Sequence, residues 1–136
     1  MNHVAVNRAG DVFRGLLVPV WAPMAAPATS VRQERRADGA LHWCFELALG
    51  RRWSLRLELA PEGADGVGLA AFLRPTGLAL RAAALGRRPG DSGYRQVHRE
   101  SLAGGVTPEA AEQGLYRVLA AVRRDRSVRE YLDRLP

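Results

Sequence analysis

Residues 41–59 read LHWCFELALGRRWSLRLEL, and this stretch decides the fold. From 41 to 49, an apolar side chain occupies every odd position, and His, Cys, Glu and Ala lie between them. Residues 53–59 repeat the alternation, with Trp and Leu at the odd positions and Ser, Arg and Glu between them. A period of two residues indicates a strand with one buried face. The stretch therefore predicts two strands joined by Gly-Arg-Arg.

The register of this hairpin follows from the same alternation. If residues 50–52 form a three-residue loop, Trp43 lies opposite Leu59 and Glu46 lies opposite Arg56. A two-residue loop would place apolar side chains opposite charged ones, so the pattern rejects it. We expect the apolar side chains of both strands on one face and the Glu46–Arg56 pair on the other.

A second hairpin is predicted from the next alternating stretches. Apolar residues fall at the odd positions of 67–73 and at the even positions of 78–84. The Arg-Pro-Thr-Gly sequence at 74–77 favours a type I turn, because proline presets the backbone angle that the second turn position needs. With a connection at 60–66, residues 39–86 are predicted to form a four-stranded antiparallel meander.

The C-terminal part, residues 107–136, predicts two helices. Thr107, Pro108 and Glu109 are typical of a helix start: a capping side chain, a proline in the first turn and an acid near the positive end of the dipole. After residue 122 the apolar phase breaks, and Ser127 with Glu130 matches a capping box that starts a second short helix. The apolar stripe of the first helix consists of Ala111, Leu115, Val118, Leu119 and Val122.

These elements predict a single α+β domain, 1–136, in which C-terminal helices pack on one face of the sheet. Residues 87–106 are expected to be a loop or edge segment anchored by Tyr94 and Val97. Residues 1–38 are expected to hold a short helix capped by Asp11 or a short strand, followed by a Pro- and Ala-rich surface connection. Residues 1–28 weakly resemble an export signal, but Asp11 and Pro19 argue against that interpretation.

The composition of the chain limits the classes of function that it can have. The 136 residues carry a formal charge of +6, and all 20 basic residues are arginine. No apolar run approaches the roughly 20 residues of a membrane-spanning helix. The lone cysteine excludes a disulfide within the chain, and we expect a cytoplasmic protein.

Catalytic and metal-binding constellations are weak in this sequence. His42 and Cys44 point the same way from one strand, but two residues do not make a metal site. The expected cross-strand neighbour of Cys44 is Glu58, which raises a thiol's pKa and disfavours a nucleophile. His98 and Ser101 lie three residues apart, a spacing that rarely gives triad geometry. We therefore expect no enzyme, no metal and no cofactor.

The open face of the predicted sheet is where we expect a partner to bind. It mixes apolar side chains with arginines, as protein interfaces do, and a sheet edge can accept a partner's strand. The sequence thus predicts a non-catalytic adaptor, chaperone or regulatory subunit that binds a protein or a second copy of itself. The residues expected to bind this partner are Arg56, Phe72, Arg81, His42 and Glu46.

The alternative is an arginine-rich protein that binds the phosphate backbone of DNA or RNA. Against it, the predicted topology scatters the arginines and turns Trp43, Phe45 and Trp53 inward, unlike a base-stacking platform. The candidate anion-binding residues are Arg87 and Arg88 in a glycine-rich loop, and Arg123, Arg124 and Arg126 at the break between the predicted helices.

Overall fold

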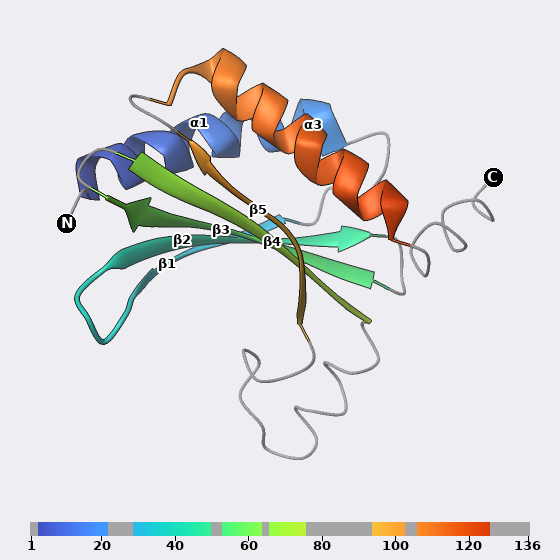
Figure 1. The fold of residues 1–136 in the computed structure, drawn as a ribbon, viewed down its shortest axis with the longest axis horizontal. Coiled ribbons are helices and arrows are strands. Elements are labelled where there is room, and N and C mark those ends of the chain that lie inside the picture. The colour runs from blue at the N-terminus through green and yellow to red at the C-terminus, as the bar shows by residue number, and fades with distance from the viewer. Residues whose placement is uncertain are drawn as a thin grey trace.

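The computed structural model describes residues 3–21, 29–49, 53–63, 66–75, 94–102 and 106–125. Within these ranges the chain is α+β, with a five-stranded antiparallel sheet and two helices (Figure 1). In chain order the elements are α1 (His3–Trp21), β1 (Thr29–Arg35), β2 (Leu41–Leu49), β3 (Trp53–Glu62), β4 (Gly66–Pro75), β5 (Arg95–Leu102) and α3 (Pro108–Arg124).

The central hairpin forms with the predicted register. Trp43 pairs with Leu59, and Glu46 pairs with Arg56. Trp43 is 3% exposed, and the other buried odd-position residues of the two strands are Leu41, Phe45, Leu47, Leu55, Leu57 and Leu59, while Trp53 is partly buried. Because a slip of one residue would move every apolar side chain to the other face, the alternation alone was enough to fix the pairing.

The sheet has five strands in the order β1-β2-β3-β4-β5, so the prediction of four was wrong. The prediction that β4 forms a hairpin with residues 78–84 was also wrong. One edge of β4 pairs with β3, and the other pairs with β5. The apolar alternation at 78–84 was mistaken for the partner strand; residues 76–93 themselves lie outside the described residues.

Strand β5 is the edge segment expected within 87–106, and it is irregular. Ala71 pairs with His98 while Phe72 pairs with Gln96, so the ladder skips Val97 in a β-bulge. The bulge shifts the alternation of side chains by one residue. As a result His98 lies on the side of the sheet that carries the helices, while Gln96 lies on the opposite side.

Strand β1 corrects the prediction of a surface connection between residues 23 and 38. Residues 29–35 pair with β2 along their whole length, and Val31 packs against the core. The sequence TSVRQER lacks the apolar alternation of the inner strands. Charged side chains are common on edge strands because they discourage pairing with other chains, and this composition hides the strand from a pattern search.

Helix α1 is longer than predicted. It runs for 19 residues from His3 to Trp21, so Asp11 lies in its middle rather than at its start, and the helix continues past Pro19 for two residues. Its core-facing side is formed by Val6, Ala9 and Phe13, which are fully buried at helical spacing.

Helix α3 confirms the predicted C-terminal helix. The Thr107 hydroxyl accepts a hydrogen bond from the backbone N–H of Ala110 at 3.2 Å, and all five residues of the predicted stripe are buried. The helix ends at Arg124; the second helix predicted from Ser127 lies outside the described residues.

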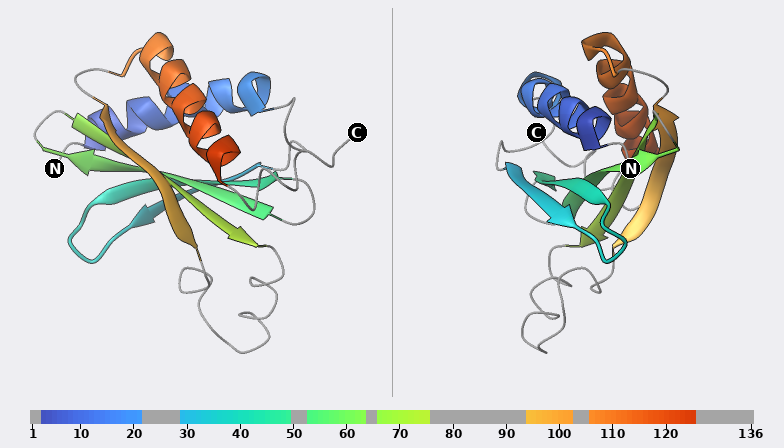
Figure 2. Two further views of the ribbon diagram at one scale, coloured as in Figure 1. Left: turned by 45° about the vertical axis from the view of Figure 1, so that its right-hand side comes forward. Right: turned by 90° about the vertical axis from the view of Figure 1, so that its left-hand side faces the viewer.

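Both helices lie on the same side of the sheet and contact each other (Figures 1 and 2). Helix α1 packs on β2, β3 and β4, and α3 packs on β5. The predicted two-layer architecture is confirmed, although one of the covering helices comes from the N-terminal end of the chain. Among the described residues, no helix has both the length and the apolar character needed to cross a membrane.

Candidate functional site

The face of the sheet turned away from α1 and α3 is covered by neither helix (Figure 2). Strand alternation places on it the residues that lie between the buried odd positions, and the strand pairing aligns them into rows. We call this surface the open face. Its principal side chains are Arg32 and Glu34 from β1, His42, Cys44 and Glu46 from β2, Arg56 and Glu58 from β3, and Phe72 and Arg74 from β4.

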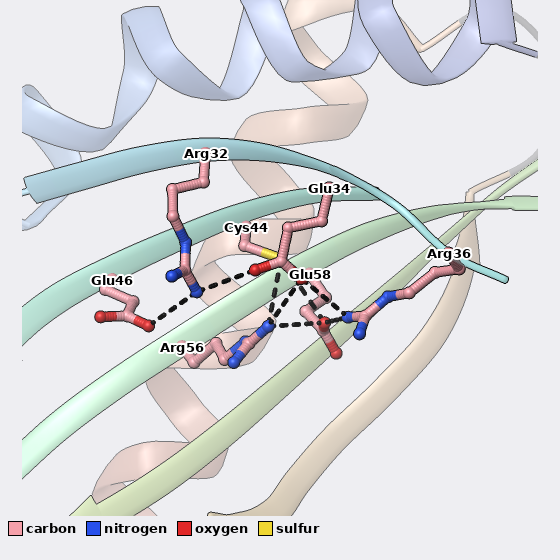
Figure 3. Close-up of polar contacts among 7 residues, drawn as sticks. All are labelled: Arg32, Glu34, Arg36, Cys44, Glu46, Arg56 and Glu58. Carbon is pink, nitrogen blue, oxygen red and sulfur yellow. Dashed lines mark hydrogen bonds and ion pairs between the residues drawn. The ribbon is translucent and has the colours of Figure 1, made fainter. Parts of the chain in front are cut away.

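A network of arginines and glutamates crosses the open face from β1 to β3 (Figure 3). At its β1 end, one guanidinium nitrogen of Arg32 lies 3.0 Å from Glu34 and 3.4 Å from Glu46. Glu34 in turn lies 3.4 Å from Arg36 and 3.6 Å from Arg56. These ion pairs join β1 to β2 through Glu46 and β1 to β3 through Glu34, which ties the charged edge strand to the interior of the sheet.

Arg56 is the buried centre of this network. Only 7% of the residue is exposed, and its terminal nitrogen lies 3.2 Å from Glu58 and 3.3 Å from the Cys44 sulfur. Burial lowers the pKa of Arg56, but the contacts with Cys44, Glu58 and Glu34 outweigh it and raise the pKa overall. Arg56 is therefore held as a cation in a partly desolvated position.

The surroundings of Cys44 disfavour the thiolate form that a nucleophile needs. Burial raises the pKa of its thiol to about 11, although the hydrogen bond from Arg56 acts in the opposite direction. Glu58 lies across the strand pair, 3.5 Å from the sulfur, and also raises the pKa. The sequence correctly predicted that Glu58 raises the pKa of the Cys44 thiol, but burial of the thiol is the larger cause of the increase.

A shallow pocket of about 200 Å³ opens beside Arg56. It is lined by Arg36, Arg56, Glu58, Phe72 and Tyr94. Two of its polar atoms, Nε of Arg56 and the hydroxyl of Tyr94, are buried and form no hydrogen bond. Buried polar groups in folded proteins are normally satisfied, so two unsatisfied atoms beside one pocket are unusual.

Tyr94 reaches the open face because of the bulge in β5: even-numbered residues lie on that face before Val97 and on the helix side after it. Its ring is stacked by Arg74, whose guanidinium carbon lies 4.0 Å from the ring centroid, and Arg56 lies 5.8 Å from the same centroid. Burial is the main cause that raises the pKa of Tyr94, so the phenol is neutral at ordinary pH. The pocket thus has an aromatic wall backed by cations.

His42 lies on the same face, at the β2 position opposite Glu34. Its Nδ1 is buried without a hydrogen-bond partner. Burial, followed by the nearby Arg36, lowers the pKa of His42. The imidazole is therefore neutral near pH 7 and adds a polar but uncharged side chain to the surface.

The predicted partner-binding residues come together in part. Arg56, Phe72, His42 and Glu46 all lie on the open face, with Arg56 paired to Glu46 on one side and to Phe72 on the other. The remaining partner-binding candidate, Arg81, lies outside the described residues, as do the candidate anion-binding residues Arg87, Arg88 and Arg126.

Arg123 and Arg124, the other candidate anion-binding residues, are exposed in the last turn of α3. That helix packs on the opposite face of the sheet from the open face. The two arginines therefore do not join the charged network around Arg56, and within the described residues no single anion-binding cluster unites the candidates.

Sequence reasoning missed several residues that build the site. Arg32, Glu34 and Arg36 were assigned to a surface connection, Arg74 to a turn, and Tyr94 to the anchor of an edge segment. The one local indication of β1 was Val31, an apolar residue with polar residues on both sides. Nothing in the local pattern predicts the bulge that brings Tyr94 beside Arg74.

A second polar cluster lies on the helix side of the sheet, between β5 and α3. Glu100 accepts hydrogen bonds from Nε and a terminal nitrogen of Arg117 at 2.9 and 2.6 Å, and lies 2.5 Å from Nε2 of His98. Ser101 hydrogen-bonds instead to Glu62, so the described residues hold no Ser–His pair here. The same part of the chain contains no group of three metal-ligating side chains.

Comparisons with known proteins give no match: no protein-family model, no curated protein and no solved structure corresponds to this chain.

Proposed function

We propose that this protein is a non-catalytic interaction module that binds a protein partner on the open face. The observation that carries the proposal is the combination, on a face that neither α1 nor α3 covers, of a buried arginine with aromatic side chains around a shallow pocket. Arginine and aromatic residues are the types most enriched at the energetic centres of protein interfaces.

The charge network supports this proposal, because it makes the surface preorganised. Arg32, Arg36 and Arg56 are held by carboxylates of β2 and β3, so little side-chain entropy is lost when a partner covers them. Side chains already fixed in the free protein contribute their contacts at a lower cost than mobile ones do.

Nucleic-acid binding is less favoured by the same observations. The arginines Arg32, Arg36 and Arg56 already face carboxylates, and a phosphate backbone would meet those carboxylates as well. Trp43 and Phe45 are buried in the core, so they offer no surface for stacking bases.

The test compares capture of partners by the full chain and by two variants. Phe72→Asp places a charge on the open face, and Tyr116→Asp makes the matched change on α3, where Tyr116 is 53% exposed. We expect the Phe72 variant to lose the captured proteins and the Tyr116 variant to keep them. Equal capture by both variants, or submicromolar binding of generic DNA or RNA with a steep salt dependence, would overturn the proposal.

A further inference from the structure

We infer that the pocket beside Arg56 is the recognition site for one acidic side chain of a partner peptide, an aspartate or a glutamate. This inference rests on the proposed function and adds the chemistry that the open face selects. It depends on the lining of the pocket, its size and its two unsatisfied polar atoms.

The lining favours an anion with a single charge. Arg36 and Arg56 supply two cations, Glu58 supplies one carboxylate, and Glu34 supplies a second, 3.4 Å from Arg36 and 3.6 Å from Arg56. Arg74 adds a third cation behind the ring of Tyr94. Three arginines then face two glutamates, and the one net positive charge is balanced by a singly charged carboxylate but not by a dianionic phosphate.

The two oxygens of a carboxylate can accept one hydrogen bond from each unsatisfied atom. The Nε–H of Arg56 is a donor, and the hydroxyl of Tyr94 can donate as well. Both atoms are closed to solvent in the free chain, so the incoming group must turn the Tyr94 side chain slightly to reach them. Such rotamer changes are common when partners bind to an otherwise fixed surface.

The size of the pocket favours a side chain over a free metabolite. Pockets for small molecules enclose about 300–1,000 Å³, whereas this one measures about 200 Å³ and is open to the surface. Phe72 and the ring of Tyr94 offer an apolar wall for the methylene groups of the acidic residue. The peptide backbone would lie across the open face outside the pocket.

The experiment uses the full chain and two pools of blocked heptapeptides. The central residue is Glu in one pool and Gln in the other, and the remaining positions are randomised. Binding is measured at physiological salt, and the Nε–Hε signal of Arg56 is followed by nuclear magnetic resonance. We expect the Glu pool to bind about tenfold more tightly, as charged hydrogen bonds do, and to shift the Arg56 signal.

Two charge-preserving variants separate the pocket from general attraction to a basic protein. Tyr94→Phe removes the pocket hydroxyl and should weaken binding of the Glu pool by roughly fivefold. Tyr116→Phe removes a hydroxyl on α3, away from the open face, and should leave binding unchanged. Equal losses in the two variants would contradict the inference.

The remaining outcomes distinguish the inference from the proposed function. If both pools bind equally and both lose affinity in Phe72→Ala, the open face binds peptides but does not select a carboxylate, and the inference fails alone. If no pool binds, or binding does not depend on Phe72, then the inference and peptide docking on the open face both fail.

Discussion

Gly10 of α1 lies directly against the indole ring of Trp43 on β2. A Cβ atom at position 10 would come within 2.3 Å of Cδ2 of the indole, closer than any real Cβ contact. The ring is also held by a 2.9 Å hydrogen bond from its Nε1 to Asn7 and by the guanidinium of Arg14, 5.2 Å from the ring centroid. The absence of a side chain at Gly10 is therefore what lets α1 approach the sheet.

Gly10→Ala should destabilise the fold. Alanine gains about 1 kcal/mol of helix propensity over glycine, but overpacking against a fixed ring costs about 1–3 kcal/mol. Because the indole is anchored to α1 on both sides, we expect a net loss of about 1–2 kcal/mol in the free energy of unfolding. Urea denaturation followed by tryptophan fluorescence measures this difference.

Gly15→Ala is the matched control in the same helix. Gly15 is exposed, and a Cβ atom there would meet nothing within 4 Å. The substitution should raise the free energy of unfolding by up to about 1 kcal/mol through propensity alone. If both alanine variants are stabilised, the close packing of α1 on Trp43 is wrong.

The sequence could predict those parts of the fold in which burial repeats at a fixed period. The hairpin 41–59 and the stripe of α3 were predictable because each apolar residue marks the core side directly. Strand β1 was not, because an edge strand with Arg32, Glu34 and Arg35 carries no apolar stripe. The predicted helix was shorter than α1, because Asp11 is typical of a helix start and Pro19 of a helix end. In the structure, the packing of Val6, Ala9 and Phe13 against the core stabilises the helix across both positions.

The Glu100–Arg117 pair should make stability depend on pH. Burial raises the pKa of Glu100, but hydrogen bonds from Arg117 and His98 outweigh it and lower the pKa below 4.5. A carboxyl with a lowered pKa in the folded state stabilises the protein above its unfolded pKa, and this contribution is lost as the pH falls through the folded pKa. Glu100→Gln should therefore cost about 1 kcal/mol near pH 7, since Arg117 is half exposed, and less in acid.

A double-mutant cycle isolates this effect from other carboxylates that titrate in the same range. The free energy of unfolding is measured for Glu100→Gln, Arg117→Gln and the double variant, at neutral pH and below pH 4. The coupling energy between the two positions should be present at neutral pH and should diminish in acid. A coupling energy that is the same at both pH values would contradict the assigned pairing.

Cys44 should resist alkylation in the folded protein. The side chain is fully buried and burial raises the pKa of its thiol to about 11, so the reactive thiolate is scarce at pH 8. Iodoacetamide should label the native chain no faster than the chain unfolds. It should label the denatured chain as fast as it labels the thiol of free glutathione. Since Cys44 is the lone cysteine, one mass measurement reports the result. Rapid labelling of the native chain would show that β2 and β3 do not enclose the thiol.

The composition of the open face could be predicted only where both neighbouring strands were recognised. The rows through Glu46, Arg56 and Phe72 followed from the alternation of β2, β3 and β4. The pocket could not be predicted in this way, because it needs Arg36 from the turn after β1 and Tyr94 from the N-terminal side of the bulge in β5. A bulge inserts a single residue into the ladder, and no periodic signal marks it.

Tyr94 provides the last prediction, which separates its ring from its hydroxyl. The hydroxyl is buried without a partner, a state that costs about 1–3 kcal/mol, whereas the ring stacks on Arg74. Tyr94→Phe should therefore raise the free energy of unfolding by about 1 kcal/mol. Tyr94→Leu, which loses the stacking, should lower it by about 1 kcal/mol.

Chemical denaturation of the two variants beside the parent chain measures both effects. A Phe variant less stable than the parent would show that the hydroxyl has a partner in the folded chain, and the pocket would then lack one of its two unsatisfied atoms. A Phe variant that is more stable but binds acidic peptides less well would indicate that the hydroxyl lowers stability and contributes to binding. Residues that cost stability in the free protein and contribute affinity in a complex are typical of functional sites.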